Sequence, residues 1–485
     1  MASSSLKKDA ILGVFWSAVQ KFGISIISFT SNVVLARLLS PDDYGCIGLL
    51  AIFIAISNVF VNGGFVSALI QKKDTSAVDY STVFYWNIVI SLLFYWLLFV
   101  SAPFIASFYR IEQLSVILRV LGIVLVINGI SVVQATILRK SFLFRKLAKI
   151  NIISSIVSVS IAIFLAYSGS GVWALVAQQI IQRACSALIL WFSSQWKPQL
   201  LFSIKSFVGM FSYGSFLLLS ELVNSTFDNV QGLLIGKRYS AGDMGYYTQA
   251  KKLEEIPTQS ISMLVAQVTF PIFSKIQDDK EKLFLAVKST LSLMNYVNFS
   301  LMILLIIVAK PLLLLLYSEK WTSSVPYFQI LCLAGLVNCM QSVNYQVVAA
   351  VGRSKELFYW NIIKRCFGII LMLVGMLYGV KGILWGMVIS FYFTYIVNAW
   401  LASKYTHYTL FQQLVDSLPL FSIAVLAGII SYLCSCIINI HGYFLLLSSQ
   451  VLFYVLIILL LSYAMRVKEL FELIDILNII IHRKK

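Results

Sequence analysis

The chain has 485 residues, of which 60% are apolar and only 12% are charged, and its mean hydropathy is +0.88. A soluble globular protein carries about 25% charged residues, so this composition excludes a chain of soluble domains. Apolar runs of about 20 residues, long enough to cross a hydrocarbon core of about 30 Å, recur from one end to the other. We therefore expect an integral membrane protein.

Fourteen such runs follow one another along the chain. Backbone groups that face lipid must find hydrogen-bond partners within their own segment, and no alternation of period two suggests a barrel, so the runs are predicted to be helices. The predicted fold class is an all-α polytopic membrane protein with about 14 transmembrane helices. They lie near residues 11–37, 44–70, 80–108, 115–138, 147–168, 171–194, 205–236, 245–273, 288–317, 325–351, 357–378, 381–402, 418–438 and 443–465.

The distribution of the 37 Lys and Arg residues predicts the orientation of these helices. If both termini are cytoplasmic, 25 of them fall in cytoplasmic segments, 8 fall on the opposite side and four lie within runs. Basic residues are enriched in cytoplasmic loops, so this bias favours an even number of spans with both termini inside. The net charge of +17 then follows from topology and from attraction to anionic lipid, and no nucleic acid partner is needed to explain it.

A short motif recurs 200 residues later in the chain. The stretch Ala36–Gly45 (ARLLSPDDYG) joins the first and second runs, and Gly236–Gly245 (GKRYSAGDMG) joins the seventh and eighth, with Ser, Asp and Gly in common. Weaker matches pair Lys140-Ser141 with Arg353-Ser354 and Gly171-Val172 with Gly382-Ile383. Their shared order predicts two pseudo-symmetric six-helix lobes in a parallel repeat, with the binding site at the lobe interface near the bilayer midplane. The expected divisions are 1–200, 201–403, and 404–485 for two additional helices with a short basic tail.

These motifs resemble a known family. Leu35–Gly45 after a first run that contains Trp16, Gly63-Gly64, Leu138–Lys140 and Gly169–Ala174 together resemble the polysaccharide-export flippases of the Wzx type, particularly the colanic-acid-exporter-like branch. The resemblance covers essentially the whole chain, and the wider superfamily includes multidrug-extrusion antiporters and peptidoglycan-precursor flippases. It implies a two-lobe transporter that moves undecaprenyl-diphosphate-linked oligosaccharide across the bacterial inner membrane. The implied partners are that lipid, the surrounding membrane lipids and components of a polysaccharide polymerase.

The seventh run carries the richest set of intramembrane polar residues. An ionisable group costs at least about 2.5–3.5 kcal/mol at the centre of a membrane helix, so such residues face protein or water and are functional candidates. At spacings of three, seven and ten residues, one helical face presents Glu221, Asn224, Asp228 and Gln231. Two interpretations are open: this face lines a substrate cavity, or it is a polar seam that joins two helices.

The first run mirrors this face with Lys21 and Asn32, eleven residues apart. At the repeat offset of 200, Lys21 corresponds to Glu221. Opposite charges at pseudo-equivalent positions predict an ion pair across the central cleft, and a substrate phosphate or a proton can replace one partner. Alternatively, Lys21 extends its ammonium group to the inner headgroups.

The eighth run adds two cations and a carboxylate to the predicted cavity: Lys251, Lys252 and Glu255. An ammonium group binds a diphosphate well, although Lys251 and Glu255 are four residues apart and can pair on their own helix instead. Further candidates for the cavity are Asn58, Asn62 and Arg183. The alternative for the two amides is an interhelical hydrogen bond, and the alternative for the arginine is contact with the inner headgroups.

Features of an enzyme are missing from the sequence. The three histidines, His407, His441 and His482, lie far apart near the ends of runs, and the predicted loops of about 3 to 15 residues are too short for a catalytic domain. We therefore predict no catalytic residue, no metal site and no cofactor. Coupling of transport to a proton or sodium gradient is compatible with the sequence.

Two other functions stay open. A cation-coupled multidrug antiporter of the same fold would need a net-negative cavity for cationic drugs, which Lys21, Lys251 and Lys252 oppose. A membrane-embedded glycan polymerase or transferase would need a large periplasmic loop or a His/Asp catalytic pair, and the chain offers neither.

The predicted topology can be tested with reporter fusions. A reporter fused within Arg139–Lys149 should give a cytoplasmic signal, and one fused within Glu319–Ser324 should give a periplasmic signal, because of the bias in basic residues. Exchanged signals would contradict the topology.

Overall fold

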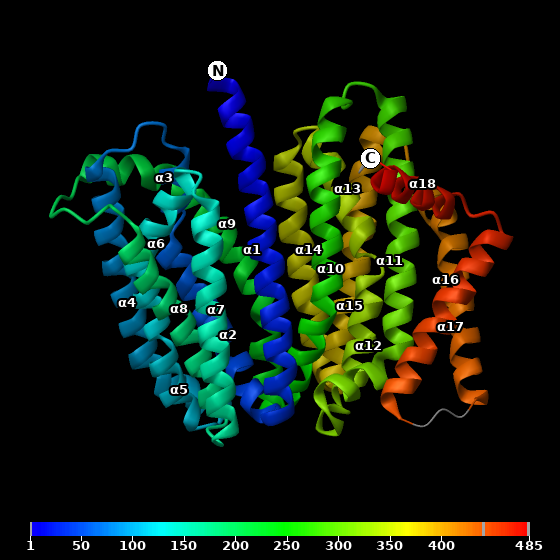
Figure 1. Ribbon diagram of the computed structural model, residues 1–485, viewed down its shortest axis with the longest axis horizontal. Helices are drawn as coiled ribbons and strands as arrows, with labels where there is room; N and C mark the ends of the chain where they lie inside the picture. Colours follow the sequence, from blue (N-terminus) through cyan, green and yellow to red (C-terminus); the bar gives the residue numbers. More distant parts are fainter. Residues whose placement is uncertain (1, 439–441, 483–485) are drawn as a thin grey trace. The chain divides into compact units, whose positions relative to one another are not determined.

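The computed structural model describes residues 2–438 and 442–482, so His441 and the basic residues 483–485 lie outside it. Every regular element within the described ranges is a helix, which confirms the predicted all-α class (Figure 1). Contacts divide the chain into two compact units, residues 1–245 and 246–485. The predicted lobes divide at residue 200 because of the sequence repeat, whereas the contacts divide the chain at residue 245. The two-lobe division stays a prediction.

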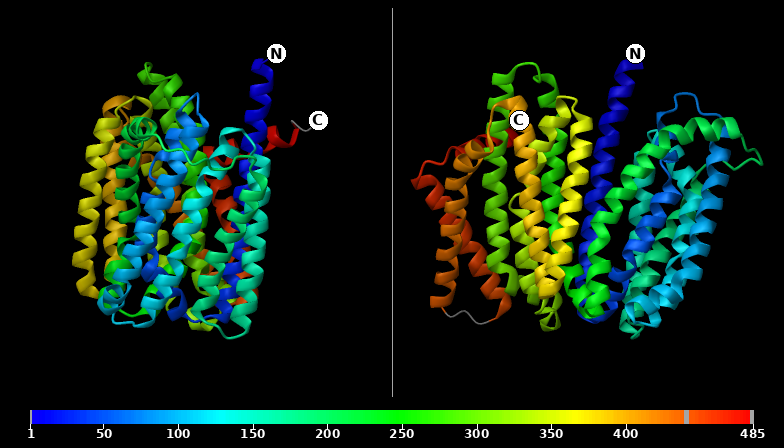
Figure 2. Two further views of the ribbon diagram at one scale, coloured as in Figure 1. Left: turned by 90° about the vertical axis from the view of Figure 1, so that its left-hand side faces the viewer. Right: turned by 180° about the vertical axis from the view of Figure 1, so that it is seen from behind.

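The first unit is built from long helices that pack mainly side by side. Helix α1 packs against α7, α7 against α8, α6 against both α4 and α8, and α9 against α2 (Figures 1 and 2). Its elements are α1 (Ala2–Leu38), α2 (Pro41–Asn62), α3 (Phe65–Gln71), α4 (Ala77–Tyr109), α5 (Gln113–Leu121), α6 (Ile123–Lys140), α7 (Phe144–Tyr167), α8 (Val172–Ser193), α9 (Ile204–Arg238) and the first turn of α10 (Ala241–Lys275).

The second unit packs α14 against α15, α15 against α13, and α11 against both α16 and α17. The last helix, α18, lies crosswise to α11 and α17 and packs against both (Figures 1 and 2). After the rest of α10, the elements are α11 (Lys280–Tyr317), η1 (Glu319–Trp321), α12 (Ser324–Gly335), α13 (Asn338–Ala350), α14 (Ser354–Gly375), η2 (Met376–Tyr378), α15 (Gly379–Thr406), α16 (Leu410–Ile437), α17 (Tyr443–Ala464) and α18 (Lys468–His482).

The predicted count of fourteen spans is not confirmed. Among the described residues, 11 helical segments are long and apolar enough to cross a membrane, or up to 12 if the bent helix α9 counts as one span. Two features lower the count. Helices α12 and α13 are separately too short to cross. Helices α14 and α15 pack against each other, but they follow one another through η2 without a gap, so the apolar stretch Ser354–Thr406 counts as one segment.

The repeated motif forms the same local structure twice. Ser40 precedes α2, where its Oγ accepts from the Asp43 amide at 3.2 Å and the Asp43 carboxylate accepts from the Ser40 amide at 2.9 Å. Ser240 and Asp243 repeat both bonds before α10, at 3.0 and 3.2 Å. Each pair is a capping box that satisfies amides left unpaired at a helix start.

The two copies of the motif also contact each other through their glycines. A Cβ added at Gly45 would lie 1.8 Å from the carbonyl oxygen of Ala241, and a Cβ at Gly245 would lie 1.9 Å from that of Pro41. Gly245 is the repeat equivalent of Gly45, and Ala241 is the repeat equivalent of Pro41. The same contact is therefore made twice, once by the glycine of each motif copy. Only glycine allows two helix starts to approach this closely.

A second pair of close contacts fits α2 into the bend of α9. Gly63 and Gly64 end α2 with φ of +52° and +67°, a left-handed conformation that favours glycine. A Cβ at Gly64 would lie 2.2 Å from the carbonyl oxygen of Gly214. That glycine lies at the 56° bend between the two straight parts of α9, Ile204–Ser212 and Leu217–Arg238 (Figure 2).

Two of the basic residues counted as cytoplasmic lie inside a helix. The 25 residues predicted to be cytoplasmic include Lys364 and Arg365, but α14 begins at Ser354 and carries both well inside the helix. The Lys364 side chain is buried, and its Nζ donates to Asn398 Oδ1 of α15 at 2.7 Å. Removing the two residues from the cytoplasmic set leaves the bias in the same direction.

We expect Gly45→Ala and Gly245→Ala to destabilise the protein, because each methyl group would overlap a carbonyl oxygen of the other helix. Overpacking of this kind typically costs about 1–3 kcal/mol and outweighs the gain of about 1 kcal/mol in helix propensity. Gly209→Ala in α9 is the matched control, since a Cβ there meets nothing within 4 Å. The midpoint of thermal unfolding in detergent should fall for the first two variants only, and equal midpoints for all three would contradict the contact.

Candidate functional site

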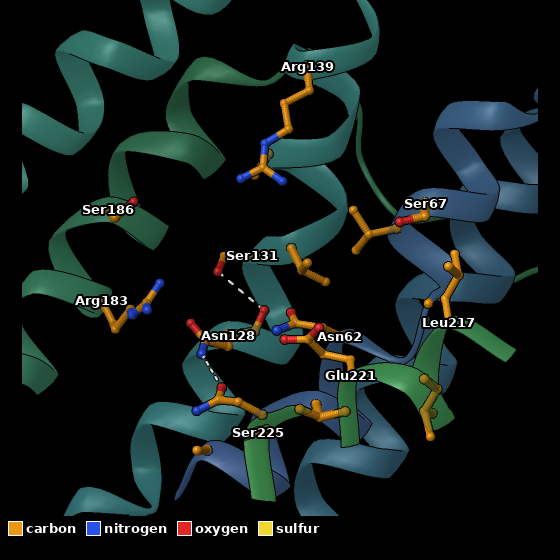
Figure 3. A pocket seen from close by; sticks show the side chains of 18 of the residues that line it. Asn62, Ser67, Asn128, Ser131, Arg139, Arg183, Ser186, Leu217, Glu221 and Ser225 are labelled. Atoms are coloured by element: carbon orange, nitrogen blue, oxygen red, sulfur yellow. Dashed lines mark hydrogen bonds between the residues drawn. The ribbon is translucent and has the colours of Figure 1, made fainter. Parts of the chain in front are cut away.

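A polar cavity of about 760 Å³ lies inside the first unit. Six helices contribute side chains to it: α2, α3, α6, α7, α8 and α9, and Figure 3 shows many of these side chains. Its lining is unusual for the interior of a membrane protein because it combines two guanidinium groups, one carboxylate and four side-chain amides. These are Arg139, Arg183, Glu221, Asn58, Asn62, Asn128 and Asn151.

Helical periodicity brings these side chains together. On α6, Asn128, Ser131 and Arg139 are spaced by three and eight residues, so they form one stripe along the helix. Arg183 and Ser186 are neighbours on one face of α8, a single turn apart. The cavity is therefore formed where polar stripes of neighbouring helices face one another.

A hydrogen bond between two amides fixes one wall of the cavity. Asn128 Nδ2 donates to Asn58 Oδ1 at 2.7 Å and so joins α6 to α2, while Asn58 Nδ2 donates to the Ile54 carbonyl at 3.0 Å (Figure 3). The Asn58 side chain therefore makes an interhelical bond and also lines the cavity. The two interpretations of this residue are compatible.

The two arginines provide the positive charge of the cavity. Arg183 lies near the middle of α8 and Arg139 is the penultimate residue of α6, and both side chains point into the cavity (Figure 3). Glu221 of α9 is the single carboxylate among the described lining residues. The lining thus carries a net positive charge, and a guanidinium can bind phosphate oxygens through two parallel hydrogen bonds.

The cation next to Arg139 has a different role. Lys140 Nζ donates to the Leu69 carbonyl at 2.9 Å, to Thr75 Oγ1 at 3.0 Å and to the Lys72 carbonyl. These bonds close the end of α3 and the loop that follows it. Of this basic pair, Arg139 alone lines the cavity.

The polar face predicted on the seventh run is divided in the structure. Glu221 lines the cavity, whereas Asn224, Asp228 and Gln231 are not among the lining residues. Gln231 is buried one turn after Phe227, and its Nε2 donates to the Phe227 carbonyl at 3.5 Å. The four residues share a helix, but the structure brings only the first of them to the cavity.

The remaining predicted residues lie elsewhere. Lys21 and Asn32 belong to α1 and do not line the cavity. Lys251, Lys252 and Glu255 belong to the part of α10 in the second unit, where Lys251 Nζ lies 3.8 Å from Glu255 Oε1.

Arg139 and Asn151 line the cavity but were not predicted to do so from the sequence, whereas Asn128 was one of several intramembrane amides that could bind sugar hydroxyls. Arg139 was counted only as a cytoplasmic charge because it ends an apolar run. Its spacing of eleven residues from Asn128, which is close to three helical turns, was the signal that both share a face. For metal binding, the described residues contain no group of three or more His, Cys, Asp or Glu side chains that could hold an ion.

Comparisons with known proteins agree with this picture. The family described as "Polysaccharide biosynthesis protein" matches residues 34–326. The chain is 26% identical over 431 residues to the Teichuronic acid biosynthesis protein TuaB of Bacillus subtilis (strain 168), covering 88% of this chain and 89% of that one. It is 23% identical over 437 residues to the Lipopolysaccharide biosynthesis protein WzxC of Escherichia coli (strain K12), with the same coverage.

Among solved structures, the chain resembles the lipid II flippase MurJ in an inward closed conformation. The TM-score is 0.76 and the identity 18%, and the match covers 93% of this chain and 98% of that one. At this identity the likeness shows a shared fold. The family match spans more than half of the sequence, and the chain is an integral membrane protein that belongs to the polysaccharide biosynthesis protein family.

Proposed function

We propose that this protein is a flippase that carries a polyprenyl-diphosphate-linked oligosaccharide across the bacterial inner membrane, with both termini in the cytoplasm. Its family membership, its relatives in surface-polysaccharide biosynthesis and its MurJ-like fold support a transporter of lipid-linked glycans. On this proposal the prenyl tail stays in the lipid while the polar head passes through a hydrated cavity. Polymerase components are proposed as neighbours, and a proton or sodium gradient as the driving force.

The observation that carries the proposal is the placement of Arg183 and Arg139 in one cavity between membrane-spanning helices. An arginine at such depth is costly unless water, protein or a ligand solvates it. A diphosphate supplies negative charge and planar pairs of acceptor oxygens, which match two guanidinium groups. We propose that Arg183 holds the diphosphate at depth and that Arg139 receives it at the end of α6.

The amides around the arginines suit the rest of the head. Asn62 and Asn151 present donors and acceptors to the cavity, and sugar hydroxyls both donate and accept hydrogen bonds. An amide can rotate to serve either need, so this lining tolerates different sugars better than a set of fixed charges would. The glycan itself therefore stays open in this proposal.

A drug antiporter is the weaker alternative for this cavity. A site for cationic drugs needs more carboxylates than cations, but the described lining has two arginines and one glutamate. The excess of positive charge would repel a cationic ligand and attract an anionic one.

Arg183→Ala should reduce flipping of a lipid-linked oligosaccharide in proteoliposomes, because the diphosphate loses a charge-assisted hydrogen-bond pair. Such bonds contribute about 1.5–3 kcal/mol, so we expect the rate to fall by roughly 10-fold to 100-fold. Arg183→Lys should recover part of it. Arg119→Ala is the control, since Arg119 is an arginine of the same unit that stacks on Phe99 outside the cavity. Equal rates for Arg183→Ala and Arg119→Ala would argue against the proposed site.

The proposed coupling between Lys21 and Glu221 has its own test. If the two groups meet in one state of the transport cycle, each single Ala variant strands a charge, and the double variant loses less stability than the two losses added together. Removal of one partner from a desolvated ion pair typically costs about 3–5 kcal/mol, well above the scatter of independent sites. Free energies of unfolding measured for the four proteins give the coupling directly. Losses that add within about 0.5 kcal/mol would mean that the residues do not interact.

A further inference from the structure

A second cavity, of about 600 Å³, lies in the first unit where α1 runs beside the start of α7 (Figure 1). Three aromatic rings and three cations dominate its lining, and no carboxylate occurs among its described residues. Leu12, Gly13 and Trp16 come from α1, and the segment 142–146 with Lys149 comes from α7 and the turn before it.

Two local features shape the apolar wall of this cavity. Phe142 adopts a left-handed backbone conformation with φ of +56°, and the residue is 51% exposed. Gly13 makes room for Phe144, since a Cβ on that glycine would lie 2.9 Å from the Phe144 ring. The Arg145 guanidinium lies 5.3 Å from the centre of the Trp16 ring, a cation–π contact that holds it at the edge of the cavity.

The cations differ in what they already bind. Lys146 Nζ donates to the Ser193 carbonyl at 2.6 Å and so caps the end of α8. Arg145 keeps its hydrogen-bonding groups available while it stacks on Trp16. Lys149 forms neither a hydrogen bond nor an ion pair within the described ranges. The start of α7 adds unpaired backbone amides, because its first residue is preceded by Leu143, which supplies no side-chain cap.

The preference for basic residues in cytoplasmic loops does not by itself explain these three cations. At the repeat offset of 213, Arg145, Lys146 and Lys149 correspond to Phe358, Tyr359 and Ile362 of α14. In the second half, the basic residues expected in a cytoplasmic loop are Arg353 and Lys355 at the start of that helix. The basic first turns of α7 are therefore specific to the first half of the protein.

We propose that this cavity is a docking site for the diphosphate head of the prenyl lipid, occupied before the head enters the arginine cavity. Arg145, Lys149 and the start of α7 bind the phosphates, and Trp16 and Phe142 contact the first units of the prenyl chain. The same turns of α7 reach both cavities, since Phe144 and Lys149 line the docking site while Leu147 and Asn151 line the arginine cavity. This inference rests on the proposed function for the identity of the lipid.

The test is lipid binding to the full-length protein in phosphatidylcholine nanodiscs, with undecaprenyl diphosphate as the probe. The variant Arg145→Gln/Lys149→Gln changes two exposed side chains and should weaken binding at least tenfold. The matched control Arg353→Gln/Lys355→Gln, at the corresponding connection of the second half, should bind like the wild type. Inorganic diphosphate should bind at least tenfold more weakly than the lipid, because it lacks the prenyl chain.

Unchanged binding in the first double variant would overturn the proposal, and so would equal losses in both double variants. Displacement of the probe by equimolar phosphatidylglycerol would also overturn it, since the surface would then be a general site for anionic lipid. Arg183→Ala should keep this docking while slowing transport. If lipid binding depends on Arg145 and Lys149 but the protein does not flip the lipid, the proposed function is wrong and the docking site is still supported.

Discussion

A charged side chain inside a bilayer has to be solvated by the protein, by water or by a ligand, and the first unit is organised around this requirement. Arg183 lies near the middle of α8, where hydrocarbon offers it no hydrogen-bond acceptor. Polar stripes on α2, α6 and α9 face it across a cavity that contains one carboxylate for two guanidinium groups. The incomplete neutralisation leaves positive charge in the cavity, and the proposed ligand that compensates this charge is an anionic head group.

The glycines of the repeated motif explain how helices so rich in large apolar residues approach closely enough to form such a unit. Gly45 and Gly245 each remove a side chain where the partner helix presents a carbonyl oxygen, and Gly64 does the same against the bend of α9. Capping boxes at Ser40 and Ser240 satisfy the backbone at the same helix starts. A duplicated sequence thus provides both sides of one contact.

The all-α class and the approximate positions of the helices followed from apolar run length, because a bilayer imposes that length on each spanning segment. The count of fourteen went further than the structure supports, since runs such as 325–351 are broken into short helices that apolarity does not reveal. Lys364 was misplaced for a related reason. A lysine near the start of an apolar run is easily assigned to the preceding loop. In the structure the helix begins earlier, and Lys364 is buried against Asn398.

The site was harder to predict than the fold. Glu221 and Arg183 were found because isolated charges in apolar runs stand out, whereas Arg139 was hidden at a helix end among other basic residues. A single-helix pattern identifies a polar face but not the helix opposite, which is why Asn224 and Asp228 were grouped with Glu221 while the structure separates them. The second cavity was missed entirely, because the aromatic and basic residues that form it come from segments more than 120 residues apart.

Mass spectrometry of lipid-linked intermediates in cells that lack this protein distinguishes a flippase from the other functions. A flippase acts after the oligosaccharide has been assembled, so its loss should cause the complete repeat unit to accumulate on polyprenyl diphosphate. The wild-type gene should clear this intermediate and the Arg183→Ala variant should not. Accumulation of a truncated oligosaccharide would instead indicate a missing transferase, and that result, or an unchanged lipid profile, would contradict the proposed flippase function.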